Sequence, residues 1–236
     1  MCGRFVMTES GAIIADHFDL DEAPKIKARF NIAPSQAILA IRNGPSGPRE
    51  PIEANWLTWG LVPSWAKDPS IAYKTINARA ETAREKPTFR NAYRYRRCII
   101  PATGYFEWKV DHNNQKIPHY ITPERGGFFA FAGLWEHWAD PGGSEIESAT
   151  ILTTTAENHA QLSTIHHRMP VILDRKDYRI WMAEEPPGPE IYSRITRTCT
   201  DLDFKSWTVS QAVNSARVDD PLLLKPVEYY TQGELF

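Results

Sequence analysis

Cysteine is scarce in this chain of 236 residues, and its three cysteines lie far apart. Cys2, Cys98 and Cys199 are odd in number and form no CxxC pair. Disulfide frameworks and cysteine-based zinc sites both need closely spaced pairs, so we expect neither. This cysteine usage fits a reducing compartment, and we predict no metal and no cofactor.

Long apolar runs and excess positive charge are also missing. No stretch approaches the roughly 18 apolar residues of a membrane span, and the start lacks the pattern of a signal peptide. We therefore expect a cytoplasmic protein without a membrane partner, associated with the nucleoid when bound to DNA. The formal net charge is −2, so any contact with nucleic acid must rest on local charge.

Aromatic and β-branched residues fill most of the segments between turn signals. With 42% hydrophobic residues, the chain can bury a substantial core, and we expect a single domain over residues 1–236. Strands are predicted over residues 36–42, 54–61, 98–110, 117–122, 128–138, 149–155 and 204–210. The fold class is therefore α+β, with a mostly antiparallel β core.

Short helices are expected at the periphery of this core. Ser10 can cap a helix over residues 10–20, Asp174 can cap one up to Met182, and another is predicted over residues 187–196. An arginine-rich, helix-like segment covers residues 84–97 and could either extend a DNA track or form a solvated face. A loop rich in glycine and proline is expected over residues 43–48.

Cys2 follows the initiator methionine and is small enough for Met1 to be removed after synthesis. Removal would leave an α-amine and a thiol on adjacent carbons, and both groups ionise near neutral pH when unperturbed. The amine can form a Schiff base with an aldehyde, and the thiol can close that bond into a thiazolidine ring. The plain alternative is an ordinary cysteine at a frayed chain end.

Six ordered motifs along the chain resemble the SRAP family, the SOS response-associated peptidases. They are Met1-Cys2-Gly3-Arg4-Phe5, Arg29-Phe30-Asn31-Ile32-Ala33-Pro34, Ile76-Asn77-Ala78-Arg79-Ala80-Glu81-Thr82, Gly104-Tyr105-Phe106-Glu107-Trp108, Ile165-His166-His167-Arg168-Met169-Pro170 and the tail over residues 209–226. The resemblance implies a barrel-like β core and a protein that crosslinks itself to abasic sites in single-stranded DNA. An opened abasic sugar carries an aldehyde, which is the group that a 1,2-aminothiol traps.

The resemblance also implies a catalytic group of Cys2, Asn77, Glu107 and His166. Glu107 lies in an aromatic strand, which would raise its pKa and suit it to proton transfer, whereas a salt bridge to Arg79 or Arg4 is the structural alternative. His166 has an unperturbed pKa near ~6.5 and can act as a second acid-base group. Asn77 can orient the amine or the sugar through its planar amide.

In the family an acidic residue is common at the position that His167 occupies here. We therefore do not expect the orienting contact that such an acid would make with His166. The adjacent histidines, with His159 nearby, leave a metal site as an alternative for this segment, although no further spaced ligands support one.

Further motif residues are expected to contact DNA. Arginines can grip phosphates through their forked guanidinium groups, and tryptophans can stack on bases with little sequence preference. The predicted DNA-binding residues are Arg4, Asn31, Pro34, Trp65, Arg79, Trp108 and Arg168. For Trp108, packing in the core is an equal alternative.

Two other functions begin from the same residues. Class II glutamine amidotransferases also start with Met-Cys-Gly and use the processed cysteine as nucleophile, but the continuation Arg4-Phe5 and the lack of a His-Asn-Gly motif argue against them. A non-covalent reader of modified cytosine would have no need for Cys2. The family name further implies a peptidase-like self-release of the adduct.

Overall fold

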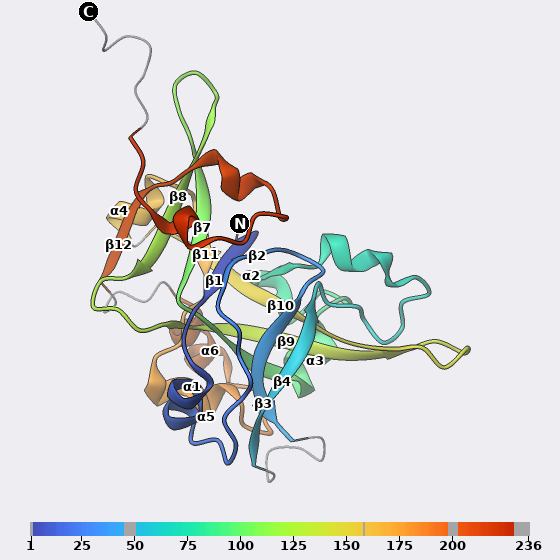
Figure 1. The fold of residues 1–236 in the computed structure, drawn as a ribbon. Coiled ribbons are helices and arrows are strands. Elements are labelled where there is room, and N and C mark those ends of the chain that lie inside the picture. Colours follow the sequence, from blue (N-terminus) through green and yellow to red (C-terminus); the bar gives the residue numbers. More distant parts are fainter. Residues whose placement is uncertain (1, 45–50, 158, 198–202, 229–236) are drawn as a thin grey trace, which may run out of the picture.

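A closed β-barrel forms the centre of the protein, and Figure 1 shows its arrangement in the computed structural model, which describes residues 2–44, 51–157, 159–197 and 203–228. Five strands pair in a ring, β10 with β4, β3, β6, β9 and again β10. All of these pairs are antiparallel except β10 with β4, which is parallel. The strands of the barrel are β3 (Ala37–Asn43), β4 (Ile52–Trp59), β6 (Arg97–Ala102), β9 (Phe129–Ala139) and β10 (Glu145–Thr155).

The second half of β10 carries two short strands, one on each side. β5 (Asn77–Arg79) runs parallel to it, with Asn77 opposite Ile151. β11 (Arg168–Pro170) runs antiparallel, with Arg168 opposite Thr155. Two of the predicted site segments are therefore attached to the same barrel strand.

A second sheet of five antiparallel strands lies beside the barrel. Its strands are, in spatial order, β12 (Phe204–Thr208), β8 (Lys116–Pro123), β7 (Gly104–Val110), β1 (Arg4–Met7) and β2 (Arg29–Ile32). The predicted fold class, a mostly antiparallel, barrel-like β core with short peripheral helices, is confirmed. The extent of the domain over residues 1–236 stays a prediction, since residues 229–236 lie outside the described part.

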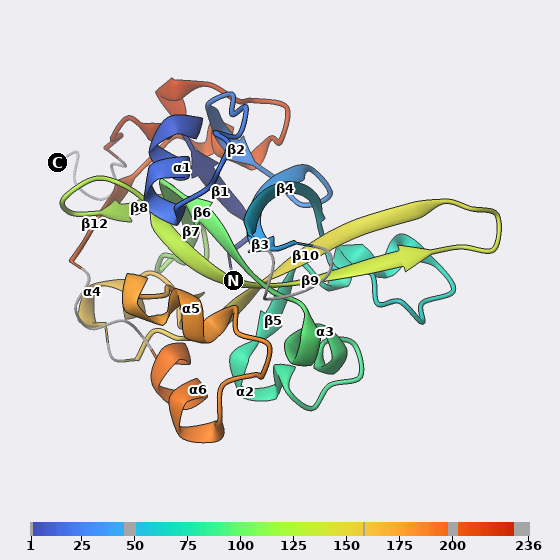
Figure 2. The same cartoon turned by 90° about the horizontal axis from the view of Figure 1, so that it is seen from below.

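The helices are short and lie around the two sheets (Figures 1 and 2). None among the described residues is long and apolar enough to span a bilayer. The α-helices are α1 (Gly11–Phe18), α2 (Ala80–Ala83), α3 (Arg90–Tyr95), α4 (Ala160–Ser163), α5 (Tyr178–Trp181) and α6 (Pro189–Thr196), and the 3₁₀ helices are η1 (Pro69–Lys74), η2 (Arg175–Asp177), η3 (Gln211–Asn214) and η4 (Pro221–Leu224). Ser10 caps α1 as predicted, because its side chain accepts a hydrogen bond from the Ile13 N–H.

Two sequence-based predictions need correction here. The strand expected over residues 98–110 is two strands, because the chain leaves the barrel at Thr103 and enters the second sheet at Gly104. A Cβ on Gly104 would lie 2.5 Å from the Tyr120 ring, so only glycine fits this crossing. Asp174 stands at the N-cap position of η2, which leads into α5 and ends at Met182, but its side chain makes no capping hydrogen bond and pairs with Lys176 at 3.1 Å.

The arginine-rich segment over residues 84–97 is helical only in α3, and part of its charge is structural. Arg97 is buried, and its Nε donates to the Trp181 carbonyl at 2.7 Å. Arg96 pairs with the buried Glu136 at 2.8 Å. These two arginines therefore hold elements together and are not available for a DNA track.

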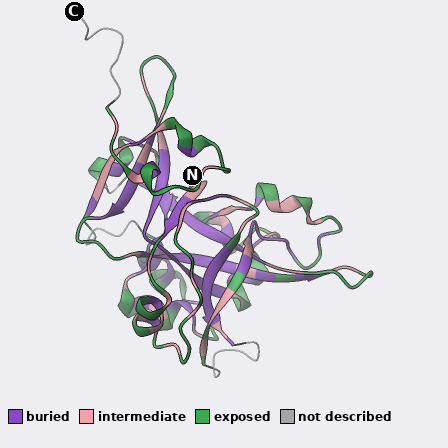
Figure 3. Cartoon of the chain, viewed as in Figure 1, coloured by how far each residue is buried: buried purple, intermediate pink, exposed green. Residues whose placement is uncertain are grey.

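Hydrophobic residues fill the barrel and the space between the two sheets, while the helices and loops carry the exposed residues (Figure 3). Strand β1 separates two clusters of side chains. Phe5 packs edge-on against Trp59 in the main core, with ring centroids 5.1 Å apart. Val6, its neighbour, points into a smaller cluster with Phe106 and Val213. The second cluster packs the C-terminal tail, residues 209–228, onto the second sheet.

The barrel interior has no space for an added methyl group at Gly133. A Cβ there would lie 2.8 Å from both Cys98 Sγ and the Cδ1 of Ile100. We expect Gly133→Ala to lower the free energy of unfolding by about 1–3 kcal/mol through overpacking, measured by urea denaturation. Gly188→Ala is the control, because nothing lies within 4 Å of its added Cβ. An equal effect at both positions would contradict this account of the core.

Candidate functional site

The N-terminal strand brings the predicted catalytic residues together. Arg4 on β1 pairs with Phe106 on β7, which places Cys2 near Glu107, the next residue of β7. Asn77, the first residue of β5, donates from Nδ2 to the Cys2 carbonyl oxygen at 2.7 Å. The sheet pairings therefore gather residues that are up to 105 positions apart in the sequence at one end of the barrel.

The thiol of Cys2 is fully buried, which changes its expected chemistry. Its Sγ lies 3.9 Å from the Arg4 carbonyl oxygen. Burial, and then the negative charge of Glu107, raise the pKa of the Cys2 thiol well above its usual range. The buried Cys2 thiol therefore departs from the behaviour of an unperturbed thiol, and it needs a base to ionise.

Glu107 has the raised pKa that its sequence surroundings suggested. Its side chain is only 3% exposed. Burial disfavours the charged carboxylate and raises the pKa of Glu107, although nearby positive charge and backbone hydrogen bonding act in the opposite direction. A carboxylate of raised pKa is a stronger base, which suits it to take a proton from the neighbouring thiol.

His166 is half-buried, and its ring is held by the backbone. Its Nδ1 lies 2.9 Å from the N–H of Arg168 and 3.0 Å from the Arg168 carbonyl oxygen. Burial lowers the pKa of His166, so the neutral imidazole is favoured. The ring of His167 stacks on it with centroids 4.4 Å apart. Because the two rings stack, the exposed His167 covers one face of the His166 ring.

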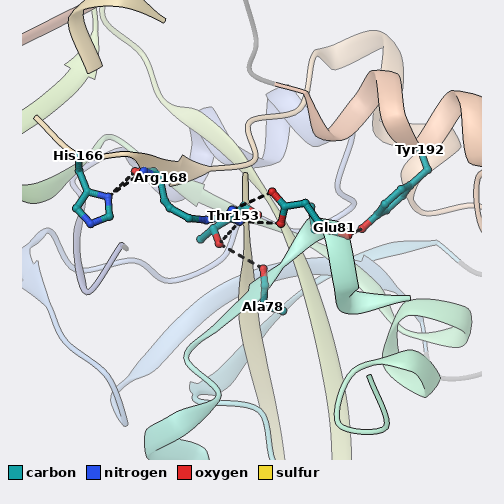
Figure 4. Close-up of polar contacts among 7 residues, drawn as sticks. Ala78, Glu81, Thr153, His166, Arg168 and Tyr192 are labelled. Atoms are coloured by element: carbon teal, nitrogen blue, oxygen red, sulfur yellow. Dashed lines mark hydrogen bonds and ion pairs between the residues drawn. The ribbon is translucent and has the colours of Figure 1, made fainter. Parts of the chain in front are cut away.

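Arg168 lies below the surface in a polar network, which Figure 4 shows from His166 to Glu81. Its guanidinium forms two parallel hydrogen bonds to the Glu81 carboxylate, at 2.8 and 3.0 Å. It also donates to the Thr153 carbonyl oxygen at 2.6 Å. Arg168 is 7% exposed, so its guanidinium supports the site from within. The guanidinium of Arg168 is therefore not placed for the direct phosphate contact that we predicted from the sequence.

A cavity of about 540 Å³ lies beside Glu107 and His166. Arg4, Glu107, Trp108 and His166, all predicted site residues, line it. Its wall also includes Val110, Lys116 and Asn214, which sequence reasoning missed as individual residues. Only the motif match over residues 209–226 pointed to the region of Asn214.

The other predicted DNA-binding residues differ in their exposure. Trp65 is 56% exposed, and Arg79 is exposed at the end of β5. Pro34 is half-buried in the turn after β2. Asn31 is buried, and its amide donates to three carbonyl groups of the C-terminal tail. Asn31 therefore faces the tail, and any influence on DNA is indirect.

No metal site forms around the histidines in the described part of the chain, since no three His, Cys, Asp or Glu side chains gather there. His159 packs edge-on against Phe204, with ring centroids 4.6 Å apart. Met1, Cys199 and residues 45–48 of the predicted loop lie outside the described residues.

The fold and the site thus define a β-barrel protein with an N-terminal cysteine held against a buried carboxylate. The family model for "SOS response associated peptidase (SRAP)" matches residues 1–216, and the chain belongs to this family. It is 41% identical to the abasic site processing protein YoaM of Bacillus subtilis, over 95% of this chain and 97% of the relative. It is 30% identical to the abasic site processing protein YedK of Escherichia coli, over 96% of this chain and 100% of the relative.

Solved structures share the fold. The chain matches a crystal structure of a protein from Bacteroides thetaiotaomicron with a TM-score of 0.82 and 25% identity, covering 96% of this chain and 100% of the other. A protein from Bordetella bronchiseptica matches with a TM-score of 0.73 and 25% identity, over 89% of this chain and 100% of the other. Both support the barrel and the second sheet as one conserved architecture.

Substituting Glu107 should change how stability depends on pH. Because burial raises the pKa of Glu107 in the folded state, stability is lost as the pH rises from the ordinary carboxyl pKa, near ~4.3, through the raised value. Glu107→Gln cannot ionise and should unfold at a higher temperature than the parent at pH 7. The difference should vanish near pH 4 in thermal denaturation. A difference that is constant with pH would contradict the raised pKa.

Removing the Arg168 side chain should destabilise the fold. Arg168→Met leaves the Glu81 carboxylate and the Thr153 oxygen atoms without their donor, and we expect a loss of about 1–3 kcal/mol in urea denaturation. Arg79→Met, at an exposed position on β5, should change stability by less than about 0.5 kcal/mol. If Arg168 only bound phosphate, both variants would be as stable as the parent without DNA.

Proposed function

We propose that this protein recognises abasic sites in single-stranded DNA and links itself to them covalently through Cys2, shielding the lesion during repair. The observation that carries the proposal is the position of Cys2, with its carbonyl held by Asn77 and its thiol against Glu107. The names of the related abasic site processing proteins support the same lesion as substrate.

The proposed reaction needs only the processed Cys2 and the opened sugar. The α-amine attacks the aldehyde carbon, and the resulting hydroxyl leaves as water to give an imine. The Cys2 sulfur then adds to the imine carbon, and its proton passes to the nitrogen. One C–N bond and one C–S bond form, one water is lost overall, and no oxidant, metal or cofactor takes part.

The two acid-base groups serve different steps of this reaction. His166 lines the cavity, and its protonated form, which the lowered pKa makes a stronger acid, is suited to protonate the sugar ring oxygen and the leaving hydroxyl. Glu107 is suited to take the proton of the Cys2 thiol, which burial makes hard to ionise. Self-release of the adduct would run these steps in reverse, consuming one water and breaking the C–S and C–N bonds, and the same Cys2, Glu107 and His166 could serve it.

Local features can hold a DNA strand despite the net charge of −2. Arg4 and Lys116 bring positive charge to the cavity wall, and Trp108 lies between them in the same lining. Arg79 is exposed at the end of the site strand β5, and Trp65 is exposed in the segment that precedes this strand. A single strand can present its unstacked bases to such tryptophans, whereas a duplex cannot, which favours single-stranded DNA as the partner.

The N-terminus provides the sharpest test of the covalent step. While a residue precedes Cys2, its nitrogen is a peptide amide whose lone pair is delocalised, so it cannot form an imine. A protein with an N-terminal tag should bind single-stranded DNA but form no heat-stable band with an abasic strand on a denaturing gel. Cleavage of the tag directly before Cys2 should restore the band, with the terminus verified by intact mass.

Variants and substrates then separate this function from its competitors. Cys2→Ser should leave only a weak adduct that borohydride traps, because serine cannot close the sulfur ring. Cys98→Ser is the matched control, since Cys98 is also fully buried but lies away from the cavity. Glutamine hydrolysis would indicate an amidotransferase-like enzyme. Selective non-covalent binding to duplex DNA with modified cytosine, without any adduct on abasic strands, would indicate a reader.

A further inference from the structure

The C-terminal tail closes one wall of the candidate site. After β12, residues 209–228 pass over the outer face of the second sheet, where Val209, Val213 and Leu223 pack against Val6 and Phe106. Figure 1 shows this segment beside β7 and β8, close to the N-terminus. Asn214, at the end of η3, is the tail residue that lines the cavity.

A chain of amide hydrogen bonds connects the tail to two strands of the site. The Trp108 indole Nε1 donates to Asn214 Oδ1 at 2.8 Å. Asn214 Nδ2 donates to Gln211 Oε1 at 2.6 Å, and Gln211 Nε2 donates to the Lys116 carbonyl oxygen at 3.1 Å. In addition, Arg4 Nη2 donates to the Asn214 carbonyl oxygen at 3.3 Å.

The direction of every bond in this chain follows from its two ends. An indole N–H can only donate, so Asn214 must present its oxygen to Trp108 and its NH₂ group to Gln211. A backbone carbonyl can only accept, so Gln211 must present its NH₂ group to Lys116. Both amides are thus used at both ends, and reversing either one would break two hydrogen bonds.

The tail is anchored at a second point away from the cavity. The buried Asn31 Nδ2 donates to the carbonyl groups of Val213, Ser215 and Val218, at 3.2, 3.0 and 2.8 Å. Asp219 Oδ1 in turn accepts from the Asn31 N–H at 3.0 Å. Asp219 lies beyond residues 1–216, the part matched by the family model. The backbone on either side of Asn214 is therefore held in place independently of the indole.

We infer that Asn214 is a positioning residue that orients the Trp108 indole for contact with single-stranded DNA. The inference rests on the proposed function, because it assigns Trp108 to the DNA-facing wall of the same cavity. Asn214 holds the edge of the indole, and the half-buried Trp108, which also packs against the second cluster, lines the cavity together with Arg4 and Lys116. A base flanking the lesion would stack on a ring whose orientation is already set, which lowers the entropy lost on binding.

A double-mutant cycle tests the coupling of Asn214 to Trp108. Asn214→Ala should weaken binding to undamaged single-stranded DNA by about 2- to 10-fold, the range of one net hydrogen bond, measured by fluorescence anisotropy. Trp108→Phe keeps an aromatic ring but has no N–H, so Asn214→Ala in that background should cause no further loss. In crosslinking assays the loss should appear as a higher concentration of abasic DNA for half-maximal rate, because Asn214 acts on binding through Trp108.

Two further variants complete the design. Gln211→Ala removes the acceptor that orients the Asn214 amide, and its smaller effect should also disappear in the Trp108→Phe background. Asn113→Ala, at an exposed position in the β7–β8 turn, should bind like the parent. Thermal denaturation of each variant shows whether the tail and the fold are intact.

The outcomes separate the inference from the function on which it rests. If Asn214→Ala weakens binding equally in both backgrounds, or does not weaken it in the parent, Asn214 does not act through Trp108 and the inference fails. If the processed parent binds no single-stranded DNA and forms no adduct with an abasic strand, the proposed function itself fails.

Discussion

The ion pair between the buried Arg168 and the exposed Glu81 is the interaction on which the site depends. Arg168 begins β11, Glu81 follows β5, and the pair reaches across Thr153 of the barrel strand between them. Burying the charge of Arg168 is costly unless its donors find partners, and here two parallel bonds to Glu81 and the bonds to the Thr153 oxygens satisfy most of them. The pair therefore sets the relative position of His166, before β11, and Asn77, at the start of β5.

Burial is the second constraint, and it determines the chemistry of the reacting groups. The aromatic core that packs Phe5 and Tyr105 also excludes water from Cys2 and Glu107, so that both lose solvation in their charged forms. Because burial raises the pKa of Glu107, its carboxylate is a stronger base toward the neighbouring thiol than an exposed carboxylate would be. The stability of the barrel and the reactivity proposed for the site thus arise from the same packing.

The C-terminal tail forms the part of the site that lies nearest to the surface. Hydrophobic contacts hold it against the second sheet, and the amides of Asn31, Gln211 and Asn214 fix its course past the cavity. The arginines have different roles. Arg4 lines the cavity, whereas the buried Arg97 and Arg168 form hydrogen bonds inside the protein. A chain with a net charge of −2 can therefore still present positive charge at one place.

The sequence by itself determined most of the strand segments, the Ser10 cap and the resemblance to the SRAP family, and it singled out Cys2, Asn77, Glu107 and His166 as candidates, because these depend on local pattern and residue chemistry. Tertiary structure decided which way each side chain faces. Arg168 and Asn31 have the sequence of DNA-contacting residues, yet partners far along the chain draw them inward. The break at Thr103, the buried state of the Cys2 thiol and the place of Asn214 likewise depend on contacts between distant segments, which no local pattern encodes.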